Sequence, residues 1–201
     1  RQSRQGKEKD GWAGFRGIWV LEDRVFGPTH PDTLRSMNGL AIARENGGKP
    51  AEAEAEHRRI LTIREKVLGP ENPDTLRTRN NIALTLDRQG KHAEAASEYR
   101  QVIDLENKVL GPEHPDTLRS RSSLAYALDH QGKFAEAELN LRDVIRLEER
   151  VLGPQHPNTL ISRLQLDKVL MSQGKYAEAE TDFRNLITLE EKVLGPEHPD
   201  T

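Results

Sequence analysis

The 201-residue sequence lacks cysteine, has few aromatic residues and contains no long apolar run. Without cysteine the chain can form neither a disulfide bond nor a thiolate metal site, and this is consistent with a reducing, cytoplasmic compartment. No stretch approaches the roughly 20 apolar residues of a transmembrane helix, and the start lacks the apolar core of a signal peptide. The formal net charge of -3 gives no basic excess. We therefore expect neither nucleic acid nor a membrane as partner.

The sequence instead contains one motif at a fixed interval of 42 residues. His-Pro-Asp-Thr-Leu or a close variant begins at His30, Asn72, His114, His156 and His198. Gly-Pro and Gly-Lys pairs follow the same period. Such a period indicates a solenoid, in which stacked units cover one another's apolar faces.

Each unit reads as two helices. Leu76, Ile82 and Leu86 form one stripe at helical spacing, and a second stripe runs from Ala95 to Leu110. Pro73 and Asp74 are typical of a first helical turn, and Gly90 can adopt the left-handed conformation that ends a helix. The second helix is predicted from about His92 to Leu110.

The period also predicts the domain boundaries. Both ends cut through a repeat, and the chain lacks an initial methionine, so we interpret it as a piece of a longer protein. In the first segment Gly11, Gly14 and Gly17 each weaken a helix by about 1 kcal/mol relative to alanine. The predicted segments are 1–29 (the second helix of a partial repeat), 30–71, 72–113, 114–155 and 156–197 (complete repeats), and 198–201 (the start of another).

The segment RNNIALTLDRQGKHAEAASEYRQVIDLENKVLGPEHP resembles the tetratricopeptide repeat, in the 42-residue form of kinesin light chains. The resemblance covers residues 30–197, with small residues such as Ala41, Ala83 and Ala125 where the family needs close helix contact. It implies an all-α, right-handed superhelical solenoid of stacked helix-turn-helix repeats.

Some residues depart from the family pattern. Arg79, Arg121 and Arg163 stand where a large apolar residue is usual. We expect them to lie along the seam between repeats, with their heads paired to acidic residues of a neighbouring helix, because a buried unpaired charge is costly. Asp167 replaces an alanine, and is expected either to loosen the last interface or to pair with Arg163. His57 replaces an aromatic residue.

The sequence gives little sign of chemistry. It contains no nucleophile elbow, phosphate-binding glycine loop or His-Glu-x-x-His motif. The repeated histidines are a whole repeat apart, which is too far for a shared ion. We therefore expect no enzyme, no cofactor and no metal.

The resemblance implies a concave groove, lined by the first helices of successive repeats, that binds a peptide or a helical segment of a protein partner. Asn81, and to a lesser extent Asn80, could instead hydrogen-bond across the helix seam. Arginines outnumber acids in the groove, so an acidic partner is favoured. The positions carried over from the family are Arg35, Asn38, Ile42, Arg77, Asn80, Asn81, Leu84, Arg88, Arg119, Ser122, Ser123, Tyr126, Asp129, Gln165 and Lys168.

Two other functions are compatible with the sequence. Similar repeats also occur as the sensing, regulatory region of larger signal-transduction NTPases. The chain could alternatively be a structural spacer that self-associates end to end.

Overall fold

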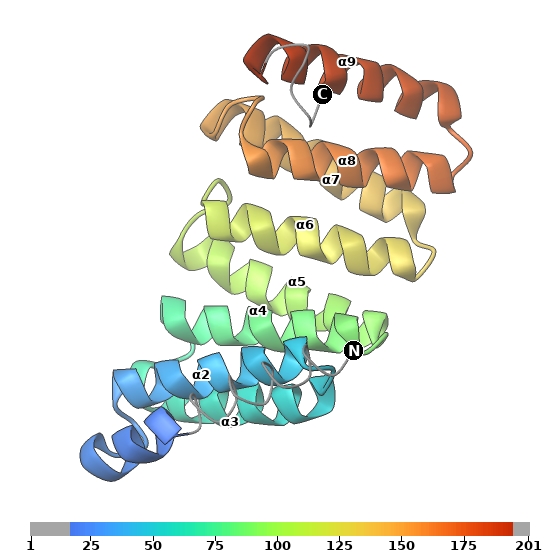
Figure 1. Ribbon diagram of the computed structural model, residues 1–201. Helices are drawn as coiled ribbons and strands as arrows, with labels where there is room; N and C mark the ends of the chain where they lie inside the picture. Colours follow the sequence, from blue (N-terminus) through green and yellow to red (C-terminus); the bar gives the residue numbers. More distant parts are fainter. Residues whose placement is uncertain (1–16, 195–201) are drawn as a thin grey trace. The chain divides into compact units, whose positions relative to one another are not determined.

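The computed structural model describes residues 17–194, which form helices joined by short turns (Figure 1). Within this range there is no strand, and the all-α repeat fold is confirmed. The predicted segment 198–201, and residues 1–16 with Gly11 and Gly14, lie outside the described residues. A helix over 17–26 precedes α2 (Pro31–Asn46), α3 (Pro50–Leu68), α4 (Pro73–Arg88), α5 (His92–Val109), α6 (Pro115–His130), α7 (Phe134–Val151), α8 (Pro157–Ser172) and α9 (Tyr176–Leu194).

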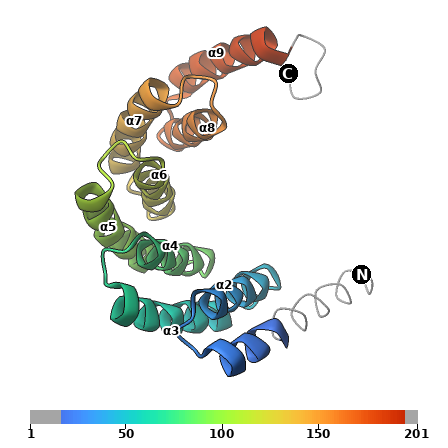
Figure 2. The ribbon, with the colours of Figure 1, turned by 90° about the vertical axis from the view of Figure 1, so that its left-hand side faces the viewer.

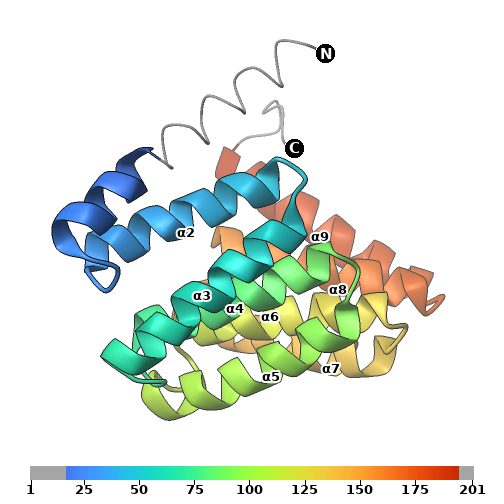
Figure 3. The same cartoon turned by 90° about the horizontal axis from the view of Figure 1, so that it is seen from below.

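The helices form two compact units, residues 17–98 and 99–194, which divide within α5. In the first unit α3 packs against both α2 and α4 (Figure 3). In the second unit α7 packs against α6 and α8, while α8 also contacts α9 and α6 (Figure 2). We call α2, α4, α6 and α8 the first helices and the others the second helices.

The repeated motif builds the start of each first helix. The side chain of Asn72 accepts a hydrogen bond from the backbone N–H of Asp74 at 2.9 Å, and Nδ1 of His114 accepts the equivalent bond from Asp116 at 3.2 Å. Proline occupies the first turn, where its missing N–H is not needed. Threonine and leucine of the motif, such as Thr117 and Leu118, are buried. The histidines therefore cap helices.

Glycines end the helices as predicted. Gly90 adopts a left-handed φ of 77° after α4. A side chain there would be strained, so the Gly-Lys pair marks the turn between the two helices of a repeat.

The three arginines that replace apolar residues all pair with acids on a neighbouring helix, as predicted. Arg79 bonds to Glu65, Arg121 to Asp143 and Arg163 to Asp182. Only Arg79 bonds to an acid of the preceding repeat. The other two bond to the second helix of their own repeat. Arg163 also lies beside Ile145 and Glu149 of the preceding repeat, at the predicted seam.

The predicted pairing of Asp167 with Arg163 is wrong, because Arg163 donates hydrogen bonds from both Nε and Nη2 to Asp182. Asp167 is fully buried, and neither of its carboxylate oxygens has a hydrogen-bond partner. Burial, together with the nearby charge of Asp182, raises its pKa to about 7.

The helix over residues 17–26 docks through one aromatic residue. Trp19 packs against a buried cluster of Leu34, Met37 and Ile60. Phe26 stacks on the His30 ring with centroids 4.7 Å apart but remains exposed, as do Ile18 and Val25. Trp19 is therefore the aromatic residue that attaches this helix to the first unit.

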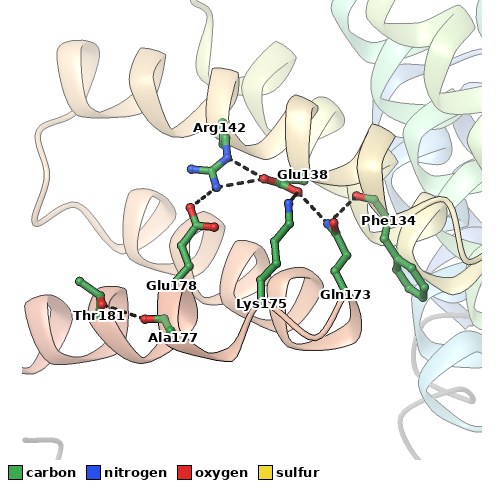
Figure 4. A network of polar contacts seen from close by, with 8 residues as sticks. All are labelled: Phe134, Glu138, Arg142, Gln173, Lys175, Ala177, Glu178 and Thr181. Atoms are coloured by element: carbon green, nitrogen blue, oxygen red, sulfur yellow. Dashed lines mark hydrogen bonds and ion pairs between the residues drawn. The ribbon is translucent and has the colours of Figure 1, made fainter.

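A half-buried carboxylate joins successive repeats at their turns (Figure 4). Glu138 of α7 accepts hydrogen bonds from Lys175 at 2.6 Å, Gln173 at 2.7 Å and Arg142 at 3.0 Å. Glu54 of α3 accepts the corresponding three bonds in the first unit. The Lys175 bond is the main reason that the pKa of Glu138 falls to about 2.

We predict that Glu138→Gln lowers the free energy of unfolding by about 1–2 kcal/mol at pH 7, because charge-assisted bonds are lost. A lowered folded-state pKa stabilises the protein above pH 4.5, so the difference from the parent should shrink as the pH falls toward 2. Urea unfolding at both pH values measures it. Glu180→Gln is the matched control, since Glu180 has the same repeat position but is exposed and bonds to Arg184 of its own helix. Equal effects of the two substitutions would contradict the prediction.

Candidate functional site

Each first helix leaves one large side chain exposed at the same repeat position. In the first unit these are Ile42 and Leu84, which are 40% and 38% exposed. In the second unit they are Tyr126, 40% exposed, and Lys168. Large apolar side chains in solvent are favourable contact points for a partner. We call the exposed sides of the first helices the first-helix surface, and treat it unit by unit.

Arginines stand beside this row in the first unit. Arg35 and Arg77 are exposed, and each bonds to an aspartate three residues earlier, Asp32 and Asp74. Arg88 lies 3.3 Å from Glu45. The excess of arginine predicted from the sequence is thus partly neutralised within the protein itself.

The asparagines link α2 to α4. Nδ2 of Asn81 donates to Oδ1 of Asn38 at 2.9 Å, and both residues are half-buried. Asn81 therefore hydrogen-bonds across the seam between the two first helices. Asn80 is half-buried as well.

In the second unit Lys168 connects α8 to α6. Its Nζ lies 3.1 Å from the buried carboxylate of Asp129 and 5.2 Å from the Tyr126 ring centroid. A cation at this distance from an aromatic face is attracted to it, and the centroid of the His130 ring lies 4.1 Å from that of Tyr126. These two contacts hold Tyr126 in place while it remains partly exposed.

Of the other predicted residues of this unit, Arg119 is exposed and the serines and Gln165 are not. Ser122 is buried and its hydroxyl lies 3.1 Å from that of Ser162. Ser123 and Gln165 are half-buried. Arg119 is exposed and bonds to Asp116 at 2.6 Å.

Sequence reasoning missed two apolar residues of α8. Ile161 and Leu164 are 52% and 48% exposed. They occupy the repeat positions of Arg119 and Ser122. A comparison of the residues at each position of successive repeats could therefore have found them. The first-helix surface consequently changes from basic on α2 and α4 to apolar on α8.

Among the side chains that the structure describes, no group of three or more histidine, aspartate or glutamate residues could hold a metal ion. None of the helices that the structure describes has the length and apolar character needed to cross a membrane.

Comparisons with known proteins agree on one family. Two family models, both described as a tetratricopeptide repeat, match residues 45–108 and residues 117–158 and 162–200. No curated protein matches the sequence.

Solved structures show the same repeat architecture. The kinesin light chain nearly identical TPR-like repeats of Podosopora anserina are 25% identical, cover 94% of this chain and 90% of that chain, and superpose with a TM-score of 0.79. BtubC (BKLC) from P. vanneervenii is 16% identical, with 96% and 94% covered and a TM-score of 0.65. Bacillus thuringiensis PlcR, solved in complex with the peptide PapR7 and DNA, is 16% identical, with 98% and 75% covered and a TM-score of 0.61.

Proposed function

Because this chain belongs to the tetratricopeptide repeat family, in its kinesin-light-chain-like form, we propose that it is a non-catalytic interaction module that binds a segment of a protein partner. The row of exposed large side chains on the first helices carries this proposal. The structural similarity to PlcR, which was solved in complex with a peptide, supports a peptide segment as the ligand. The lack of cysteine supports a cytoplasmic location.

The contacts proposed in the first unit are Arg35, Ile42, Arg77 and Leu84, and those in the second are Arg119, Tyr126 and Lys168. The arginines favour an acidic segment. Exposed pairs such as Arg77 with Asp74 contribute about 0–1 kcal/mol, so the guanidinium can turn to a partner carboxylate at little cost. Asn38, Asn81 and Ser122 instead hold neighbouring helices together.

We predict that the double variant Leu84→Ser, Tyr126→Ser captures its partner at least tenfold less than the parent from a lysate, because each anchor contributes about 1–2 kcal/mol. Quantitative mass spectrometry of the captured proteins measures this, after circular dichroism has shown equal helicity.

Leu139→Ser is the matched control, since Leu139 is 73% exposed but lies on the second helix α7. A protein retained by the parent and by Leu139→Ser, and lost by the double variant, is the expected result. If the double variant retains every protein that the parent captures, the first-helix surface is not the binding site.

A further inference from the structure

A cavity of about 490 Å³ in the first unit lies between the starts of α2 and α4 and the end of α3. Three arginines line it, Arg35, Arg64 and Arg77, and the carboxylate of Asp74 is its acidic group. Leu34, Val67 and Leu68 supply an apolar wall, and the last two are partly exposed. The cavity therefore combines a surplus of positive charge with an apolar wall.

Arg64 is the unusual member of this set. It is only 5% exposed, yet among the described residues no carboxylate pairs with it. Its Nη1 donates to the carbonyl oxygen of Asp74 at 2.8 Å and to Oγ1 of Thr78 at 2.7 Å, while Nε is buried without a partner. The Asp74 carboxylate is bonded to Arg77 instead. A buried guanidinium without an acidic partner is strongly unfavourable and attracts an anion.

The electrostatics point the same way. Burial is the main reason that the pKa of Arg64 is lowered, and the charges of Arg77 and Arg35 lower it further, against the opposing charge of Asp74. An anion that enters the cavity would thus meet the positive charge of Arg64, which this protein leaves uncompensated.

The other repeats carry the opposite charge at this position. Glu106 and Glu148 occupy the repeat position of Arg64, and both are buried. The fold at this joint accepts either charge, so the arginine is not required for packing. Charge reversal at one joint of a near-identical series makes this joint chemically distinct from the others.

We propose that this cavity binds a carboxylate of the partner, with Arg64, Arg35 and Arg77 around the carboxylate and an adjoining apolar side chain against Val67 and Leu68. The inference rests on the proposed function, because it names the chemistry of one end of the bound segment. A planar carboxylate matches the paired donors of a guanidinium, and the enclosed position of Arg64 strengthens that bond.

The test uses N-acetyl-leucine, which joins a carboxylate to an apolar side chain, and N-acetyl-leucinamide, which lacks the charge. We expect the arginine Nε–Hε resonances of Arg64 and Arg77 in ¹⁵N-correlated NMR spectra at low salt to shift saturably with the acid and not with the amide. A Glu-containing peptide amide and a peptide with a free carboxyl terminus then distinguish a side-chain carboxylate from a terminal one. Equal shifts with the amide, or a response to inorganic phosphate but none to N-acetyl-leucine, would overturn the proposal.

Variants test whether the three arginines bind the carboxylate. Arg64→Glu, the residue of the other repeats, should abolish the saturable shift at Arg77. The exposed double variant Arg35→Gln, Arg77→Gln should weaken binding at least tenfold at Arg64 without affecting the fold. Arg146→Gln is the matched control, because Arg146 is exposed and bonds to an aspartate three residues earlier on α7. Unchanged binding by Arg64→Glu would sink the proposal. If this titration fails, the capture experiment can still support the first-helix surface as the binding site. If the capture experiment fails, the titration can still support the carboxylate site. The two proposals therefore fail separately.

Discussion

Replacement of Asp167 by alanine is expected to stabilise the second unit, by about 2–4 kcal/mol at pH 8. Asp167 is fully buried on α8, and its carboxylate oxygens have no hydrogen-bond partner. The equivalent residues of the other repeats, Ala41, Ala83 and Ala125, are alanines that are equally buried. Alanine therefore fits the site and removes a charge that the surroundings do not compensate.

The stabilisation should depend on pH in a defined direction. The pKa of Asp167 is raised from 3.8 to about 7 by burial and by Asp182, against the opposing charge of Arg163. Between these pH values the unfolded chain has released the proton and the folded chain retains it. The free energy of unfolding of the parent therefore falls as the pH rises from about 4 to 7. The gain from Asp167→Ala should be smaller at pH 5 than at pH 8, by about 2 kcal/mol.

Amide hydrogen exchange of α8 measures this local stability, because a stack of repeats does not necessarily unfold in one step. Asp167→Asn keeps the shape and removes the charge, so it should lose most of the pH dependence while retaining part of the penalty for a buried polar group. A gain from alanine that is the same at pH 5 and pH 8 would contradict the raised pKa.

The fold could be predicted because every residue of the repeated His-Pro-Asp-Thr-Leu motif has a local structural role. Asn72 caps α4, Pro73 and Asp74 suit the first turn of this helix, and Thr75 and Leu76 are buried. Such roles depend on near neighbours in the chain, and the 42-residue period then repeats them.

The partners of the arginines could be predicted only by type. A half-buried guanidinium is stabilised by an acid, and all three of these arginines pair with one. The acids do not share a repeat position, however. Asp143 is replaced by Asn185 in the next repeat, so Arg163 bonds to Asp182 instead. Which helix supplies the partner depends on side-chain packing, and a single sequence does not contain that information.

The candidate site, too, could be predicted from the sequence only in part. The exposed row of Ile42, Leu84 and Tyr126 follows from the period. Arg64 was missed because its role arises where the repeats differ, with glutamate at the equivalent positions. Sequence periodicity predicts what the repeats share, while the properties of a single joint depend on exceptions to it.

The second large effect is expected for His57→Leu in the first unit, with the opposite pH dependence. His57 is fully buried on α3, and neither ring nitrogen has a hydrogen-bond partner. Burial, with a smaller contribution from the charge of Arg64, lowers its pKa from 6.5 to about 4. In this range the unfolded chain binds the proton and the folded chain does not, so the free energy of unfolding of the parent falls as the pH drops below 6.5.

Leucine occupies the same repeat position in the second unit, where Leu141 is buried. His57→Leu should therefore be accommodated, and should increase the stability of α3 by about 2 kcal/mol more at pH 5 than at pH 8. Hydrogen exchange of the α3 amides at the two pH values provides the measurement. The reciprocal substitution Leu141→His tests the cause, since it should destabilise α7 and give the second unit the same sensitivity to acid. If His57→Leu has an equal effect at both pH values, the buried imidazole is not what makes the first unit acid-sensitive.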